Sequence, residues 1–360
     1  MSTPLWQPSQ QEKEKTLLTL FSHKIQQKYK LPNIEYSTLH QWSIESPELF
    51  WEEVWHDCEV RFSEPWREVM SKTVFSEEIG TESSGWFTGA RLNFAENLLA
   101  KGKAENEAIC FFGEDGSTRS LSYADLRKSV EQCASGMKAL GVTENDRVAA
   151  VLPNCPEAVI GMLSAASLGA IWSSCSPDFG IKGIYDRLGQ ITPKILITVN
   201  AYNYNGKEHQ CLDKIREISQ RIPSIESVFV SAFTKTPIEL QGKEKTWEDL
   251  LDTSAGPLAF LQLPFDHPLY ILYSSGTTGL PKSIVHGAGG TLLKHLTEHR
   301  YHADVKPCDR LFYFTTCGWM MWNWLASGLA SGATLILYDG APGFPDMGRM
   351  WRLIDDQRIT

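Results

Sequence analysis

The chain has 360 residues, of which 42% are hydrophobic and 21% charged, and its 34 basic and 43 acidic side chains give a net charge of −9. This length suffices for two domains, or for one large α/β unit with an extension. The acidic balance argues against nucleic acid as a partner, because such a partner requires a basic face, but it permits a local cationic pocket for phosphates.

The N-terminal segment, MSTPLWQPSQQEKEK, lacks the apolar core and the cleavage pattern of a secretory signal. No apolar run approaches the roughly 18 residues that a membrane span requires. The eight cysteines are scattered, with no C-x-x-C pair, which is typical of reduced and mostly buried thiols. We therefore expect a protein of the cytoplasm, in the cytosol, without a membrane span.

Residues 1–100 are rich in aromatic side chains and mainly helical in pattern. The runs LLTLFSHKIQQKY and SPELFWEEVWHDCEV space their apolar residues three and four apart, and Trp51, Val54, Trp55 and Cys58 form one stripe. The stripe predicts that this helical extension packs against the main body of the protein.

From about residue 109, strand-like runs alternate with helical ones. A helix over LSYADLRKSVEQCASGMKALG is predicted to open with a capping box of Ser122 and Asp125 and to end at Gly141. Further helices are predicted over PEAVIGMLSAASLGA and around 180–190 and 206–221. The predicted strands are AICFFG, RVAAVLP, AIWSSCS, KILITV, SVFVS, LYILYSSG, LFYFTT and ATLILYDG. This alternation predicts an α/β fold, doubly wound, with mostly parallel sheets covered on both faces.

The most informative stretch is YSSGTTGLPKSIVHGAGG, residues 273–290, which starts at the end of a predicted strand, where parallel sheets bind ligands. It differs from the P-loop pattern G-x-x-x-x-G-K-[ST], because Pro281 replaces the second glycine. The residues after Lys282, SIVH, are extended in pattern, and the next helix is expected only after Gly289 and Gly290. A Walker-type NTPase is therefore disfavoured.

The loop nevertheless has the chemistry of a phosphate site. Hydroxyl groups can bind phosphate oxygens or Mg²⁺, glycines let backbone amides converge on an anion, and Lys282 adds a positive charge. The hydroxyl and glycine positions are Ser274, Ser275, Gly276, Thr277, Thr278 and Gly279. A Ser/Gly-rich linker is the alternative, but the loop lies between two strand-like segments.

The same stretch resembles the phosphate-loop signature of the adenylate-forming superfamily, which includes acyl-CoA synthetases, luciferases and peptide-synthetase adenylation domains. In that pattern the proline is expected and a hairpin-like return follows. WFTGARLNFAENLL resembles the N-terminal extension of acetyl-CoA-synthetase-type enzymes, and TTCGWMMWNWLASGLASGATLILYDGAP is most similar to acetoacetate–CoA ligases. The resemblance implies an extension over residues 1–100 and an AMP-binding domain over 101–360 that is incomplete at its C-terminus.

The resemblance also implies an activity. Such enzymes make acetoacetyl-adenylate and pyrophosphate from acetoacetate and ATP with Mg²⁺, and then transfer the acyl group to coenzyme A. The products, acetoacetyl-CoA and AMP, would carry ketone-body carbon into cytosolic lipid synthesis. Acetate or propionate is the less favoured acid. The small-molecule partners are then acetoacetate, ATP and CoA.

Residue roles follow from the same resemblance. The loop Ser274–Gly279 would hold the β- and γ-phosphates of ATP, with Thr277 or Thr278 near Mg²⁺ and Lys282 in contact with phosphate. Lys207, in YNYNGK, is a candidate for the 3′-phosphate of CoA, although a solvated loop lysine is an equal alternative.

The acyl pocket is expected just after Gly318. Trp319, Met320 and Met321 fall at pocket positions, and Asn323 is a candidate donor to the keto group. Core packing of the two methionines is an equal alternative.

Two further hypotheses belong to other classes. The family's adenine segment, ribose aspartate and C-terminal domain with the adenylating lysine are not found after residue 340, so no catalytic residue is assigned. A truncated, catalytically impaired fragment that binds nucleotide or a partner is one alternative. A zinc hydrolase is the other, because His295, Glu298 and His299 fit the H-x-x-E-H pattern. That pattern lacks a further zinc ligand, and we expect these histidines to be partly exposed helix residues.

Overall fold

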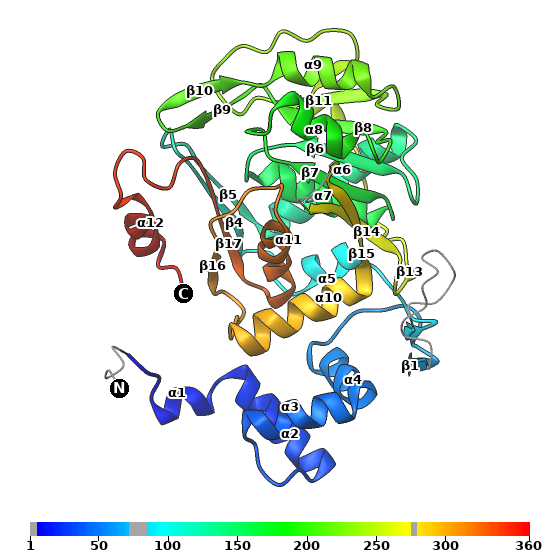
Figure 1. Cartoon of the computed structure of the whole chain (residues 1–360), viewed down its shortest axis with the longest axis vertical. Helices are drawn as coiled ribbons and strands as arrows, with labels where there is room; N and C mark the ends of the chain where they lie inside the picture. The colour runs from blue at the N-terminus through cyan, green and yellow to red at the C-terminus, as the bar shows by residue number, and fades with distance from the viewer. Residues whose placement is uncertain (1–5, 72–84, 275–278) are drawn as a thin grey trace.

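The computed structural model describes residues 6–71, 85–274 and 279–360. A bundle of N-terminal helices lies against helix α10, and two sheets with their covering helices make up the rest of the molecule (Figure 1). The helices of the N-terminal extension are α1 (Gln10–Glu14), α2 (Leu17–Tyr29), α3 (Tyr36–Glu45) and α4 (Pro47–Asp57).

The predicted apolar stripe of α4 does face the body of the protein. Val54, Trp55 and Cys58 are buried, whereas Trp51 is half-buried. The Trp55 ring stacks on Phe87, with 4.7 Å between ring centroids. The same ring also stacks on Phe265, at 6.1 Å between centroids, so aromatic contacts join the extension to the body.

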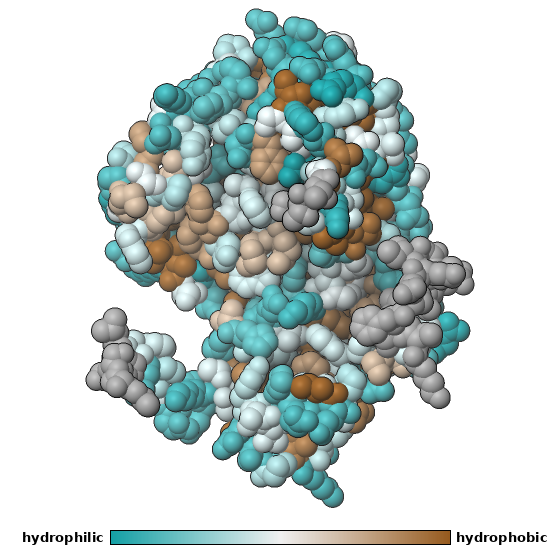
Figure 2. Space-filling model, in the orientation of Figure 1, coloured by the Kyte–Doolittle hydropathy of each residue, from teal (hydrophilic) through white to brown (hydrophobic). Residues whose placement is uncertain are grey.

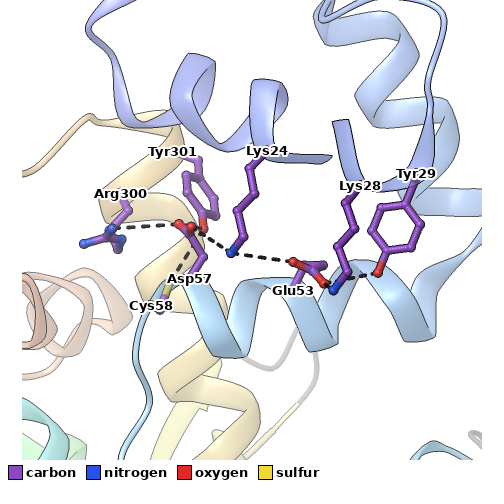
Figure 3. A network of polar contacts seen from close by, with 8 residues as sticks. All are labelled: Lys24, Lys28, Tyr29, Glu53, Asp57, Cys58, Arg300 and Tyr301. Carbon is purple, nitrogen blue, oxygen red and sulfur yellow. Dashed lines mark hydrogen bonds and ion pairs between the residues drawn. The ribbon is translucent and has the colours of Figure 1, made fainter. Parts of the chain in front are cut away.

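A polar network fixes the other side of α4 (Figure 3). The buried carboxylate of Glu53 pairs with Lys28, accepts a hydrogen bond from the Tyr29 hydroxyl at 3.1 Å, and lies 3.6 Å from the ammonium of Lys24. Each of these partners comes from α2, so the buried charge is compensated across the two helices.

Short strands link the extension to the body, and α5 (Phe94–Ala100) follows them. The antiparallel pairs are β1 (Glu68–Met70) with β2 (Trp86–Thr88), and β3 (Arg91–Leu92) with β13 (Leu263–Pro264).

The large sheet has the strand order β12-β11-β8-β6-β7-β14-β15. Its strands are β6 (Arg147–Val151), β7 (Ile171–Cys175), β8 (Ile195–Val199), β11 (Ser227–Ser231), β12 (Glu244–Thr246), β14 (Pro268–Ser274) and β15 (Lys282–Gly287). Neighbours are parallel except β14 and β15, which are antiparallel. Every residue of β7 and β8 is buried, as strands covered on both faces require.

Helices cover both faces of this sheet. Apolar side chains of α8 and α9 pack on one face, and those of α6 and α7 belong to the core on the other. These helices are α6 (Tyr123–Ala139), α7 (Pro156–Ser167), α8 (Ile181–Leu188) and α9 (Leu212–Arg221). The predicted capping box opens α6, with Ser122 and Asp125 each bonding the other's backbone amide. The predicted doubly wound α/β class is thus confirmed.

The small sheet has the order β16-β17-β4-β5, and only its β4–β5 pair is antiparallel. Its strands are β4 (Glu107–Gly113), β5 (Thr118–Ser122), β16 (Arg310–Phe312) and β17 (Thr334–Asp339). Helix α12 (Arg349–Gln357) packs on one face through Leu353. Beside this sheet lie α10 (Ala288–Thr297), the π-helical η2 (Glu298–His302), α11 (Met320–Ala326) and η3 (Ser327–Ser331), while η1 (Glu248–Leu250) follows β12.

Some predicted boundaries were wrong. The stretch 206–221 is not all helix, because β9 (Ala201–Tyr204) and β10 (Lys207–Gln210) form a hairpin before α9 begins at Leu212. Asn205 and Gly206 make its turn with φ values of 54° and 74°, which suit a tight hairpin. Strand β5 was not predicted, and α10 begins at Ala288, before the two glycines.

Candidate functional site

The phosphate-loop segment connects β14 to β15. Ser274, the last residue of β14, pairs with Lys282, the first residue of β15, so the loop leaves and re-enters the sheet at one point. This point is the carboxyl end of β14, which is where the sequence predicts that the loop starts. Gly279 is described and has a φ of 157°. The predicted residues Ser275, Gly276, Thr277 and Thr278 lie outside the described residues.

The return of the loop is held by a residue that sequence reasoning missed. The side-chain amide of Gln190, just after α8, donates to the carbonyl of Pro281 at 2.9 Å, and its oxygen lies 3.3 Å from the Ser283 hydroxyl. The side chain of Lys282 is exposed and, among the described residues, has no carboxylate partner. A lysine in this state is available to an anion at the loop.

Exposed apolar side chains lie in strand β15 and just before it, next to the loop. Leu280, Ile284 and Val285 are all exposed, although Ile284 and Val285 point to opposite faces of the sheet. Hydrophobic residues gather on the surface over this hairpin (Figure 2). The return strand is thus open on both faces along much of its length.

The predicted acyl-pocket residues lie at the start of α11. Trp319 is the N-cap and is exposed, Met320 is 47% exposed, and Met321 is half-buried. Trp319 and Met320 are therefore not core residues. Asn323 is 1% exposed, and neither atom of its side-chain amide has a partner among the described residues. Burying an amide without a hydrogen-bond partner costs free energy. The side chain of Asn323 is therefore a candidate to bind a ligand or a water molecule.

Met320 borders a cleft of about 570 Å³ that is also lined by residues of β2, β15, α10 and η2. Val285 and His286 of the return strand lie on the same cleft. The structure thus brings one predicted acyl position and the strand that follows the phosphate loop to a common cavity. It does not place Trp319, Met321 or Asn323 on that lining.

Lys207 lies in the exposed β9–β10 hairpin and does not line this cleft. The hairpin turn is fixed by Glu114, which accepts hydrogen bonds from the amides of Asn205 at 2.9 Å and Gly206 at 2.6 Å. Glu114 also accepts from the amide of Ala341 at 2.6 Å, just after β17. This carboxylate therefore ties the hairpin to the carboxyl ends of the small sheet.

Asp339, the last residue of β17, is a second group that the sequence did not reveal. Its carboxylate accepts a hydrogen bond from the amide of Asn154 at 3.2 Å. Burial, together with the negative charges of Glu114 and Asp178, raises the pKa of Asp339 to about 7. It titrates near neutral pH at an edge where the carboxyl ends of strands meet.

The prediction of partly exposed histidines was wrong. His295 and His299 are 7% and 0% exposed, because α10 and η2 are packed between the extension and η3. The Nδ1 of His295 lies 2.8 Å from the Ser327 hydroxyl, and the Nε2 of His299 donates to the carbonyl of Trp324 at 2.8 Å. Each imidazole is thus bonded to the α11–η3 segment. No cluster suited to a metal ion is found in residues 6–71, 85–274 and 279–360.

Comparisons with known proteins identify the family of the chain. The family model described as "AMP-binding enzyme" matches residues 98–360, and "Acetyl-coenzyme A synthetase N-terminus" matches residues 36–98. No helix among the described residues has the length and apolar character to cross a membrane.

Relatives are similar over nearly all of this chain. The acetoacetyl-coenzyme A synthetase of Rhizobium meliloti (strain 1021) is 44% identical, over 95% of this chain and 52% of the relative. The malonamoyl-CoA synthetase vrtB of Penicillium aethiopicum is also 44% identical, over 99% of this chain and 52% of the relative. The solved acetoacetyl-CoA synthetase from Streptomyces lividans superposes with a TM-score of 0.92 at 38% identity, covering 100% of this chain and 55% of its own. The chain spans about half the length of the curated relatives it matches.

Proposed function

The chain belongs to the AMP-binding enzyme family, and on that premise we propose that it forms the nucleotide- and acid-binding part of an ATP-dependent acetoacetate–CoA ligase. The observation that carries the proposal is the antiparallel β14–β15 hairpin, which pairs Ser274 with Lys282 at the two ends of a loop rich in hydroxyls and glycines. The division into an extension over residues 1–100 and an AMP-binding domain over 101–360 is part of the proposal.

The proposed reaction has two steps. A carboxylate oxygen of acetoacetate attacks the α-phosphorus of ATP, which forms the acyl-adenylate and releases pyrophosphate. The thiol of CoA then attacks the acyl carbon, loses its proton, and displaces AMP. Negative charge builds up on the triphosphate in the first step, so cationic and amide groups that are fixed around it favour the transition state.

This chain supplies some of those groups. Lys282 would contact the β- or γ-phosphate, and the hydroxyls of Ser274 to Thr278 would hold phosphate oxygens. Thr277 or Thr278 would help to place Mg²⁺, which would neutralise charge on the phosphates. Gln190 keeps the return strand in register by bonding Pro281. Lys207 would meet the 3′-phosphate of CoA from its exposed hairpin. In the cytosol, acetoacetyl-CoA made this way would feed lipid synthesis from ketone bodies.

The test is acid-dependent ATP–pyrophosphate exchange on this chain, with acetoacetate compared to acetate. We expect faster exchange with acetoacetate. Substituting Lys282→Ala removes the contact between the lysine and the phosphates. It should raise the MgATP concentration for half-maximal exchange about tenfold, which corresponds to a loss of about 1.4 kcal/mol in binding free energy.

Lys13→Ala is the matched control, since Lys13 is also an exposed lysine but lies on α1 of the extension. It should leave the exchange unchanged. Lack of exchange with either acid in a chain that is folded by circular dichroism contradicts the proposed activity. Equal MgATP dependence in wild type and Lys282→Ala contradicts the loop assignment alone.

A further inference from the structure

Helix α8 contacts the chain on both sides of the phosphate loop. After the loop, the carbonyl of Pro281 accepts a hydrogen bond at 2.9 Å from the side-chain amide of Gln190, which follows the helix. Before the loop, the guanidinium of Arg187 lies over the ring of Tyr273, 5.9 Å from the ring centroid. Tyr273 directly precedes Ser274, the last residue of β14. One helix therefore supports the strand that enters the loop and the segment that leaves it.

The ring of Tyr273 is also held at its other end. Its hydroxyl lies 3.1 Å from the hydroxyl of Ser173 on β7. Across the hairpin, Tyr273 pairs with Ser283, whose hydroxyl lies 3.3 Å from the side-chain oxygen of Gln190. The contacts of Arg187 and Gln190 thus converge on one cross-strand pair at the base of the loop. A shift of either side chain would move the backbone from which the loop starts.

Arg187 also stacks on a second ring. Its guanidinium lies 4.7 Å from the ring centroid of Phe179, in the segment between β7 and α8. This ring packs closely on the backbone of Gly318, because a Cβ at that position would lie 3.3 Å from the Cζ of Phe179. Gly318 precedes Trp319, where the acyl pocket is expected to begin. Arg187 therefore touches the start of the loop through Tyr273 and the start of the acyl pocket through Phe179.

The positive charge of Arg187 is not neutralised by a carboxylate. Among residues 6–71, 85–274 and 279–360 it forms no ion pair, and the one hydrogen bond of its side chain goes to the carbonyl of Gly183, at 2.7 Å. The neighbouring acid of α8, Asp186, pairs with Lys182 instead. A guanidinium stacked on two rings keeps its orientation while its charge stays available. A fixed positive charge near the loop favours a bound triphosphate.

One guanidinium is thus shared between the two substrate sites. Building on the proposed function, we propose that Arg187 is a positioning residue for both substrates, for ATP through Tyr273 and for the acid through Phe179. Attack of the carboxylate on the α-phosphorus requires both substrates to be held in one relative orientation, and a shared side chain relates the two sites directly. Gln190 positions ATP alone, because its contacts outside α8, within the described part of the chain, are with the return of the loop.

The test measures the binding of MgATP and of acetoacetate separately, by titration calorimetry on this chain and its variants. Arg187→Met removes the charge and both stacks, so the dissociation constants of both ligands should rise about fivefold. Gln190→Ala loses one hydrogen bond to the loop and should raise the constant for MgATP alone, about threefold. Phe179→Leu should raise the constant for acetoacetate alone. Side chains that merely support folding would not separate the two ligands in this way.

Two further variants complete the test. Arg187→Lys keeps the charge but not the planar stacks, so it should recover most of the MgATP affinity while the constant for acetoacetate stays raised. It also covers the case in which Arg187→Met fails to fold. Arg221→Met is the matched control, because the guanidinium of Arg221 on α9 lies 3.9 Å from the ring centroid of Tyr185 on α8. This variant removes the same kind of stack from the same helix, and both constants should equal those of the wild type.

Three results contradict this role of Arg187. They are unchanged constants for both ligands in the Arg187 variants, an equal rise for both ligands in Gln190→Ala, and a loss in Arg221→Met as large as in Arg187→Met. A wild-type chain that binds both ligands without ATP–pyrophosphate exchange contradicts the proposed activity, and the variants still decide the role of Arg187. A wild-type chain that binds neither ligand contradicts the proposed function and the role of Arg187 together.

Discussion

At the residue scale, Asp339 makes the stability of the chain depend on pH. Its pKa in the folded protein is about 7, which is well above the ordinary value of 3.8, because the carboxyl is buried near Glu114 and Asp178. A raised folded pKa means that the folded state prefers the protonated form. The stabilising contribution of that proton is complete below about pH 4 and is lost as the pH rises through 7.

Asp339→Asn should therefore stabilise the protein at pH 8 and have little effect at pH 4. The asparagine can still accept the hydrogen bond from Asn154, but it carries no charge. Each pKa unit is worth about 1.4 kcal/mol, so after solvent screening we expect a gain of roughly 1–3 kcal/mol at pH 8. Urea unfolding of both proteins at the two pH values measures it. A difference that does not change with pH would show that Asp339 does not titrate in this range.

At the scale of elements, η2 joins the body to the extension. This π-helical turn presents the hydroxyl of Tyr301 to the carboxylate of Asp57 on α4, at 2.7 Å, while Lys24 of α2 reaches the same carboxylate at 3.3 Å (Figure 3). π-helical turns are rare and redirect side chains relative to a regular helix. Here the wider turn lets Tyr301 contact Asp57 of the extension while His299 contacts Trp324 of α11.

Tyr301→Phe should loosen the extension by about 1–2 kcal/mol, because a hydrogen bond to a charged acceptor is lost. Hydrogen exchange should then quicken in η2 and α4 together. The control is Tyr29→Phe, which removes a comparable bond to Glu53 but within the extension, so only α2 and α4 should exchange faster. If the two variants give the same exchange pattern, the Tyr301 bond does not couple the extension to the body.

The elements that sequence predicted are those with a strong local signal. The apolar runs of β6, β7, β8 and β11 and the capping box at Ser122 mark their own positions, since periodicity and capping are local properties. The β9–β10 hairpin also has a local signal in Asn205–Gly206, but its polar strands lack the alternation that identifies a strand. It was consequently assigned to a loop and a helix.

The site was predictable only in part, because much of it depends on contacts between distant segments. The position of the loop follows from the strand before it and the motif within it. The anchoring of Pro281 by Gln190 spans 91 residues, and the bond between His295 and Ser327 spans 32. Whether a histidine on a helix is exposed depends on which elements pack over it, and no local pattern around His295 indicates the cover provided by η3.

At the scale of the whole molecule, one hydrophobic core joins the extension to both sheets. Among the described residues, a single cluster contains Trp55 of α4, Phe265 before β14, Trp172 of β7 and Leu337 of β17. The sequence predicts a domain boundary near residue 100. The core contains residues from both sides of that boundary, so the boundary does not separate two hydrophobic cores. Segments that share a core unfold together when the shared contacts contribute much of the stability.

We therefore expect the chain to unfold in one transition, and Trp55→Ala to shift that transition as a whole. Trp55 is fully buried and packs on Phe87 and Trp66 at centroid distances of 4.7 and 4.9 Å, so its removal should cost about 3–5 kcal/mol. Guanidinium unfolding followed by far-UV circular dichroism and by fluorescence measures this. Trp6→Ala is the control, because Trp6 is 74% exposed and its loss should change stability by less than about 0.5 kcal/mol.

Two separate transitions would mean that the extension is an independent folding unit, if Trp55→Ala lowers the guanidinium midpoint of only one of them.

The two outcomes differ in what they imply for the cleft. The cleft beside Met320 is lined by Trp86 and Phe265, which lie in or next to the aromatic contacts of the extension, as well as by α10. If the extension unfolds with the body, loss of Trp55 should lower global stability and loosen the lining of the cleft in parallel, because the same aromatic contacts support both.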